Sequence, residues 1–152
     1  MNDILKDSVL LLTVCMLASL GFICQTTLSN LIWLYHKGMP VSAGVAVTTI
    51  LSDLIGMNTQ GEFPIAVIIS AVLLIAFFAA RIMLIWVQIE QKYLYALAGA
   101  VSIFILLVSM PNFFYDLEVI AGARTYLGKF ILTCIGCLSG YVFGRNLCRS
   151  KS

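Results

Sequence analysis

The sequence predicts an all-α integral membrane protein, built as a bundle of four transmembrane helices. Its 152 residues include only 11% charged residues, against about 25% in soluble domains, and the mean hydropathy is +1.03. Residues 8–35, 63–80, 93–115 and 130–144 contain no charge, and most of these runs approach or exceed the roughly 20 residues that cross a bilayer core. The whole chain, residues 1–152, is therefore predicted to be one polytopic membrane domain.

The first span is predicted over about residues 8–35. This is longer than a perpendicular crossing needs, so the helix is expected to tilt or to protrude from the bilayer. Lys6 precedes the apolar run as in a signal peptide, but Asp3 and Asp7 break the positive region that such a peptide requires. The segment is therefore predicted to be a retained transmembrane helix.

An extra helix is predicted over about residues 40–56, between the first and second spans. Its uncharged part ends at Asp53, which makes it short for a crossing. We interpret it as an interfacial or re-entrant helix, with a fifth crossing as the alternative. The apolar residues expected to share one face of this helix are Ala43, Val47, Ile50, Leu51 and Leu54.

The second and third spans are predicted over about residues 63–90 and 93–110. Proline is tolerated in the first turn of the second span, and Arg81 is the one charge within its long apolar stretch. In the third span, Ala96 and Ala100 are small residues four positions apart, so they share a face on which another helix can approach closely.

The fourth span is predicted over about residues 121–145, and it contains a glycine stripe. Gly136, Gly140 and Gly144 recur every fourth residue and therefore lie on one side of the helix. In lipid such a stripe marks the close approach of another helix. Two interpretations stay open: packing within the chain, and an interface between copies in a homo-oligomer.

The distribution of basic residues predicts that both termini are cytoplasmic, in a bacterial inner membrane or a plasma membrane. Four crossings place both termini on one side, and six basic residues fall on that side against three on the other. The first group is Lys6, Arg81, Lys92, Arg145, Arg149 and Lys151, and the second is Lys37, Arg124 and Lys129.

A polar turn near the end of the first span is the candidate pore lining. Gln25, Thr26, Ser29 and Asn30 lie close together and are expected either to bond neighbouring helices or to line a wet cavity. Arg81 has two interpretations as well. It lies near the predicted inner boundary, where its side chain can snorkel to the headgroups, or it forms a basic ring that faces a pore.

Cys134 and Cys137 have the C-x-x-C spacing of thiol exchange or of half a metal site. A four-helix bundle with this motif near the end of a span is similar in outline to vitamin K epoxide reductases and disulfide-forming quinone reductases. That resemblance implies intramembrane redox chemistry through a second cysteine pair in an external loop. Residues 36–62 contain no cysteine, so redox chemistry ranks third among the predicted functions.

Other chemistry finds little support in the composition. The formal charge of +2 is too small to predict direct nucleic-acid binding. His36 is the only histidine, so neither a catalytic triad nor a metal site is predicted, and we expect no cofactor and no enzyme activity. The leading hypothesis is an oligomeric membrane component that acts as a scaffold or anchor subunit. Its expected partners are the lipid bilayer, copies of itself and another protein subunit, and the alternative is a homo-oligomeric pore.

Overall fold

The computed structural model describes residues 2–59, 64–87, 89–113, 123 and 125–149. Among these residues five α-helices form and no strand, which confirms the predicted all-α class. The helices are α1 (Asn2–His36), α2 (Ala43–Thr59), α3 (Ile65–Trp86), α4 (Gln91–Phe113) and α5 (Tyr126–Arg149).

Four of the helices are long and apolar enough to cross a membrane, as the sequence predicts. Their candidate spans are Leu5–His36, Ile65–Trp86, Gln91–Met110 and Tyr126–Leu147. The remaining helix, α2, has 17 residues and is shorter than the roughly 20 that a crossing needs. A short extra helix between the first and second spans is therefore present, as the sequence predicts.

Several helix ends differ from the predicted span limits. Helical hydrogen bonding in α1 begins well before residue 8, because a helix does not have to end where the lipid ends. α3 ends at Trp86 rather than at 90, since the backbone of Val87 is extended, with φ −121° and ψ 125°. The predicted starts of the second and fourth spans, at residues 63 and 121, lie outside the described residues.

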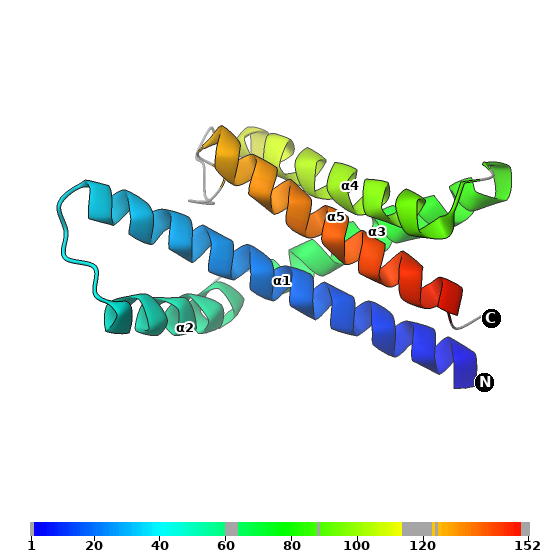
Figure 1. Cartoon of the computed structure of the whole chain (residues 1–152), viewed down its shortest axis with the longest axis horizontal. Helices are drawn as coiled ribbons and strands as arrows, with labels where there is room; N and C mark the ends of the chain where they lie inside the picture. The colour runs from blue at the N-terminus through cyan, green and yellow to red at the C-terminus, as the bar shows by residue number, and fades with distance from the viewer. Residues whose placement is uncertain (1, 60–63, 88, 114–122, 124, 150–152) are drawn as a thin grey trace.

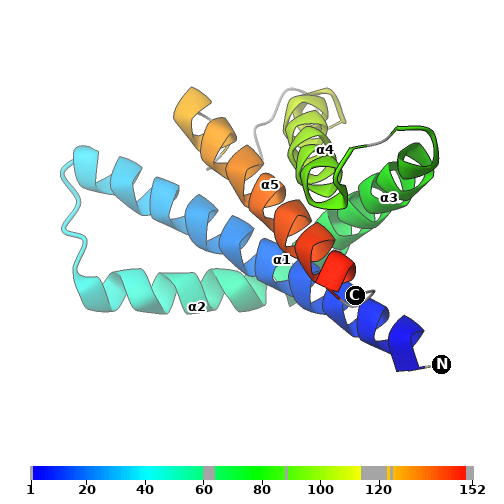
Figure 2. The same cartoon turned by 45° about the vertical axis from the view of Figure 1, so that its right-hand side comes forward.

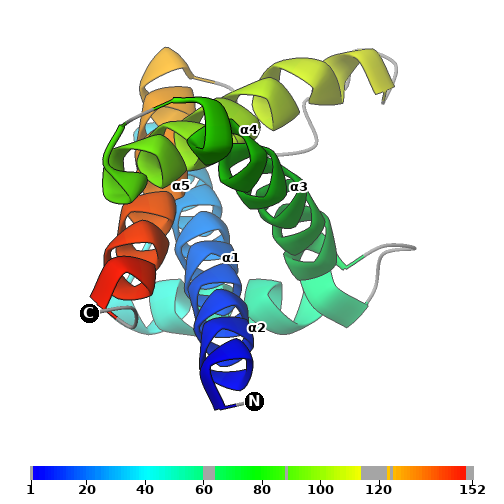
Figure 3. The same cartoon turned by 90° about the vertical axis from the view of Figure 1, so that its right-hand side faces the viewer.

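Four of the helices form two antiparallel pairs, α1 with α5 and α3 with α4, and the two pairs pack on each other. α1 lies beside α5, and α4 packs between α5 and α3, as the views in Figures 1 and 2 show. α1 begins and α5 ends at the same end of the molecule, where α3 also connects to α4 (Figure 1). Viewed from that end, α3 and α4 diverge from their connection (Figure 3).

The core lies where the four span-length helices meet, and three aromatic rings form its centre. The rings of Phe77 and Phe143 stack at 4.9 Å between centroids. Tyr95 meets both rings edge-on, at 5.7 and 5.2 Å. The three rings belong to α3, α5 and α4, so stacked and edge-to-face contacts connect these helices.

α2 packs beside the C-terminal half of α1 and contributes no buried residue. Val47 and Leu51, two of the apolar residues expected on one face of this helix, are exposed, and so is Ile55. Asp53 and Asn58 are instead half-buried. Large apolar side chains of α2 therefore point outward, while a carboxylate points inward. An amphipathic helix in water has the opposite arrangement.

Candidate functional site

The three glycines of the predicted stripe lie where α5 packs on α4 of the same chain. A Cβ built on Gly136 would lie 2.6 Å from Cγ1 of Ile103, and one built on Gly144 would meet the first turn of α4 at 2.8 Å. At Gly140 the added atom would collide with the carbonyl oxygen of Tyr95. Backbone therefore approaches backbone along the stripe, as in close packing of membrane helices.

The matching surface of α4 is centred on Gly99, a residue that the sequence analysis missed. A Cβ on Gly99 would collide with the carbonyl oxygen of Gly136. Of the predicted pair on this helix, Ala96 lies in the contact, with its Cα 3.0 Å from a Cβ built on Gly140, and Ala100 is half-buried. The available signal was a glycine inside a run of small residues on a helix already expected to pack closely.

Most hydrogen bonds of the polar turn on α1 stay within that helix. The Thr26 hydroxyl donates to the carbonyl of Phe22 at 2.9 Å, and Nε2 of Gln25 donates to Oγ of Ser29 at 3.0 Å. Asn30 is half-buried. Such bonds satisfy polar groups in an apolar helix without a neighbouring helix.

One polar atom of this turn remains unsatisfied. Oε1 of Gln25 is buried and accepts no hydrogen bond from the described residues. Gln25 follows Gly21 by one turn, and a Cβ on Gly21 would lie 3.4 Å from Ile135 of α5, so this side of α1 is turned toward α5. An unmatched buried carbonyl costs about 1–3 kcal/mol, which a water molecule or another donor would relieve.

The residue of this turn that reaches another helix is Thr27, which is 1% exposed. Its hydroxyl donates to Oδ2 of Asp53 on α2 at 2.7 Å, and it also lies 3.0 Å from the carbonyl oxygen of Ile23. The sequence predicts Asp53 within the extra helix between the first two spans, and Thr27 is not among the candidate site residues. The missed signal was a carboxylate in an apolar helix too short to span, because such a group requires a polar partner.

Arg81 does not join the polar turn. It is exposed near the end of α3 that connects to α4, whereas Gln25 lies in the half of α1 that leads to α2. These two connections are at opposite ends of the molecule (Figure 1). Within one molecule, the polar turn and Arg81, which were predicted to line a pore together, therefore lie toward opposite ends.

Exposed aromatic and basic residues mark both ends of the span-length helices. Trp33 is 52% exposed near the end of α1, and Trp86 is 86% exposed at the end of α3. Lys37 lies over the Trp33 ring at 5.8 Å, and Lys92 lies over the Tyr93 ring at 4.9 Å. Tryptophan, tyrosine and lysine in this arrangement are typical of the two membrane–water interfaces.

The two cysteines of the C-x-x-C motif are half-buried on α5, and both are free thiols. Residues three apart on a helix have Cβ atoms about 5–6 Å apart, whereas a disulfide requires about 3.5–4.5 Å. A bond between Cys134 and Cys137 would therefore distort the helix. In the described part of the chain, no group of three or more His, Cys, Asp or Glu side chains comes together.

No protein-family model, no curated protein sequence and no solved structure matches this chain.

Proposed function

We propose that this chain is a non-enzymatic membrane component that acts as a scaffold or anchor subunit, and that α2 is its partner-facing element. The observation that supports this most directly is the surface of α2. None of its residues is buried, while Val47, Leu51 and Ile55 point away from the rest of the chain. Such a surface is compatible with lipid or with an apolar protein partner.

The orientation of α2 also favours a re-entrant position over an interfacial one. A helix at the membrane surface would expose its polar groups to water. Here the carboxylate of Asp53 turns toward α1 and bonds to Thr27, while Leu51 and Ile55 face outward. This arrangement suits a helix surrounded by lipid or by apolar protein on its outer side.

Site-specific photocross-linking in native membranes tests this proposal. We would place a benzophenone amino acid at Leu51 on α2 and, as the matched control, at Phe78, which is 70% exposed on α3. We expect a protein adduct at Leu51 and lipid adducts alone at Phe78. The mass of the adduct then distinguishes a second copy of this chain from another subunit. An absence of protein adducts at Leu51 would contradict the scaffold proposal.

A homo-oligomeric pore is the second candidate, and the unsatisfied Oε1 of Gln25 is the observation that favours it. A water-filled path beside α1 would satisfy that atom. The purified protein should then make liposomes permeable to small ions, and Gln25→Leu should reduce the flux while Arg81→Gln changes the ion selectivity. Impermeable liposomes that contain correctly folded protein would exclude this candidate.

A further inference from the structure

Most polar side chains of α2 form hydrogen bonds with the backbone of their own helix. The hydroxyls of Thr48, Thr49 and Thr59 each donate to a carbonyl oxygen one turn earlier. The amide of Asn58 does the same. A carboxylate cannot form such a bond, because it has no hydrogen to donate. Asp53 therefore requires donors from outside its own helix.

Thr27 supplies one of these donors and fixes the position of the carboxylate. Its hydroxyl donates to Oδ2 of Asp53 at 2.7 Å. The second oxygen, Oδ1, accepts no hydrogen bond from the described residues, and it is not buried among them. A carboxylate has about four acceptor sites, so one bond leaves most of them unused. One oxygen is thus held by Thr27, while the other is available at the surface.

The parts of α1 and α3 that pack against α2 contain no basic residue. Residues 8–35 and 65–80 are uncharged, and α2 contacts α1 and the beginning of α3. Lys37 follows Thr27 by ten residues, about 15 Å along the chain if helical, and it lies over the ring of Trp33. Asp53 forms no ion pair with any described residue. Its charge is therefore not compensated by a neighbouring side chain in this part of the chain.

The carboxylate lies at the depth of the lipid tails. Trp33, which marks the headgroup level, follows Thr27 by six residues, or about 9 Å along α1. The large exposed residues on the outward side of α2 near this level are apolar, Leu51 and Ile55. Charges at such a depth are unfavourable unless they pair with an opposite charge or line a wet path. An ionised Asp53 therefore requires a cation from outside these helices.

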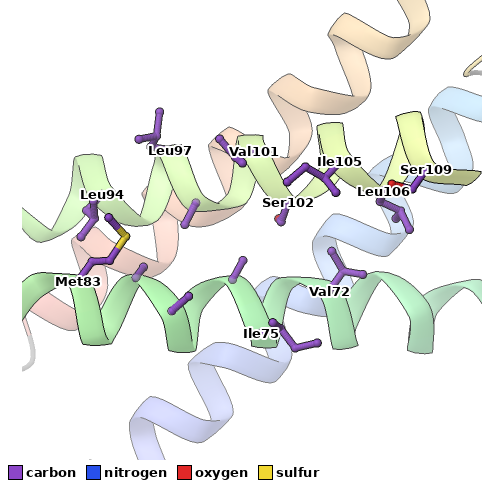
Figure 4. A pocket seen from close by; sticks show the side chains of 14 residues that line it. Val72, Ile75, Met83, Leu94, Leu97, Val101, Ser102, Ile105, Leu106 and Ser109 are labelled. Carbon is purple, nitrogen blue, oxygen red and sulfur yellow. The ribbon is translucent and has the colours of Figure 1, made fainter.

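The apolar groove between α3 and α4 is not a second site of this kind. Its lining is apolar apart from Ser102 and Ser109, and side chains such as Met83 and Val72 present only carbon and sulfur (Figure 4). The hydroxyl of Ser102 bonds back to the carbonyl of Gly99 at 3.0 Å. None of the described residues that line this groove is a carboxylate, so the groove offers a cation no opposite charge.

Small side chains border Asp53 on one side of α2. Thr49 lies one turn before it, Gly56 lies one turn after it, and Ser52 precedes it directly. On a regular helix these three residues lie within about 100° of Asp53, on the side that leads to the exposed face. We call the surface of these four residues the Asp53 edge. In lipid, small residues let another helix approach closely, so a long basic side chain on that helix can reach Oδ1.

From these contacts we infer that the Asp53 edge binds a membrane helix of the partner protein, and that a lysine or arginine of this helix pairs with Asp53. An ammonium or guanidinium group supplies several N–H donors to the oxygen that Thr27 leaves unused. Leu51 and Ile55 extend the contact to apolar residues of the same partner helix. The inference rests on the proposed scaffold function and specifies the chemistry of its partner.

Binding of a synthetic transmembrane helix tests the charge requirement. The full-length protein would be placed in phosphatidylcholine vesicles with a peptide of leucine and alanine that carries one lysine, about six residues from the end of its apolar segment. The matched peptide has leucine at this position. Energy transfer from tryptophan to a dansyl group on the peptide measures binding. We expect the lysine peptide to bind at least about tenfold more tightly, and equal binding would overturn the inference.

Asp53→Asn separates the charge from the docking of α2. The amide oxygen still accepts a hydrogen bond from Thr27, so α2 should remain docked, but the preference for the lysine peptide should disappear. Glu90→Gln is the control, because it removes an exposed carboxylate that already pairs with Lys92 at 2.6 Å. This variant should keep the preference. A preference that survives Asp53→Asn would contradict the assigned ion pair.

Dicyclohexylcarbodiimide tests whether a proton replaces the partner cation. This reagent modifies protonated carboxyl groups in apolar surroundings, whereas an ion-paired carboxylate is protected. In native membranes Asp53 should remain unmodified, as mass spectrometry of its peptide would show. Complete modification of Asp53 would identify a bound proton in place of a basic side chain and would overturn the inference.

Cross-linking in native membranes distinguishes a failure of this inference from a failure of the scaffold proposal. The benzophenone probe at Leu51 should lose its protein adduct when it is combined with Asp53→Asn, and should keep it with Glu90→Gln. An undiminished adduct with Asp53→Asn would overturn the ion pair and leave the scaffold proposal standing. Absence of the adduct from the otherwise unmodified chain would overturn both.

Discussion

Thr27 on α1 donates a hydrogen bond to Asp53 on α2, with 2.7 Å between Oγ1 and Oδ2. This hydrogen bond connects α2, which buries none of its residues, to α1, which precedes it in the chain. Because the acceptor is a carboxylate in largely apolar surroundings, this bond is expected to be stronger than one between neutral groups. We therefore expect Thr27 and Asp53 to control whether α2 stays docked.

Removal of the Thr27 hydroxyl should release α2. Thr27→Val leaves the half-buried carboxylate of Asp53 without its donor, at a cost of about 1–3 kcal/mol. Backbone amides of α2 should then exchange hydrogen faster, which mass spectrometry of peptic fragments would measure. Thr26→Val is the matched control, since its hydroxyl bonds only within α1. Equal protection of α2 in both variants would contradict the role of this bond.

Adding a single methyl group to the glycine stripe should weaken the packing of α5 on α4. Gly140→Ala places a Cβ against the carbonyl of Tyr95, and rigid backbone on both sides cannot easily move away. We expect a loss of about 1–3 kcal/mol in the free energy of unfolding in detergent.

Gly44→Ala on α2 is the control for that substitution. The nearest atom to its added methyl group is Oγ of Ser42 at 4.0 Å, so alanine should be neutral or stabilising there. If Gly140→Ala unfolds at the same denaturant concentration as the unmodified protein, the α4–α5 contact is looser than described.

The two tryptophans should report both membrane interfaces. Trp33 and Trp86 are the only tryptophans of the chain, and they lie at opposite ends of span-length helices. Trp33→Phe leaves Trp86 alone, and the reverse substitution leaves Trp33. In lipids brominated at different depths, each remaining tryptophan should be quenched most by shallow bromines. Strongest quenching by bromines near the chain ends would contradict these positions.

The motif cysteines should remain reduced without added reductant. Cys134 and Cys137 lie three residues apart on regular helix, which keeps their Cβ atoms too far apart for an unstrained bond. Both thiols should react with maleimide after denaturation in the absence of reductant. Reaction at neither residue, together with recovery of both thiols after reduction, would favour the redox alternative.

Much of the candidate site was visible in the sequence only as separate residues. The polar turn and the glycine stripe were found by spacing along single helices, but the contact of Thr27 with Asp53 joins residues on different helices. Gly99 illustrates the same limit, because its role depends on which face of α5 meets α4. Spacing identifies a face, whereas the neighbour of that face depends on long-range packing.

The sequence by itself determined that the described part of the chain has four helices long and apolar enough to cross a membrane, a shorter helix after the first, and aromatic residues near their ends. Tertiary structure alone decided that the glycine stripe packs on α4, that Asp53 of α2 turns inward, and that α3 and α4 enclose an apolar groove. The physical reason is that the lipid bilayer acts as the solvent of these helices. Lipid and protein interior are both apolar, so hydrophobicity marks the length of each helix but does not distinguish its buried side from its lipid-facing side.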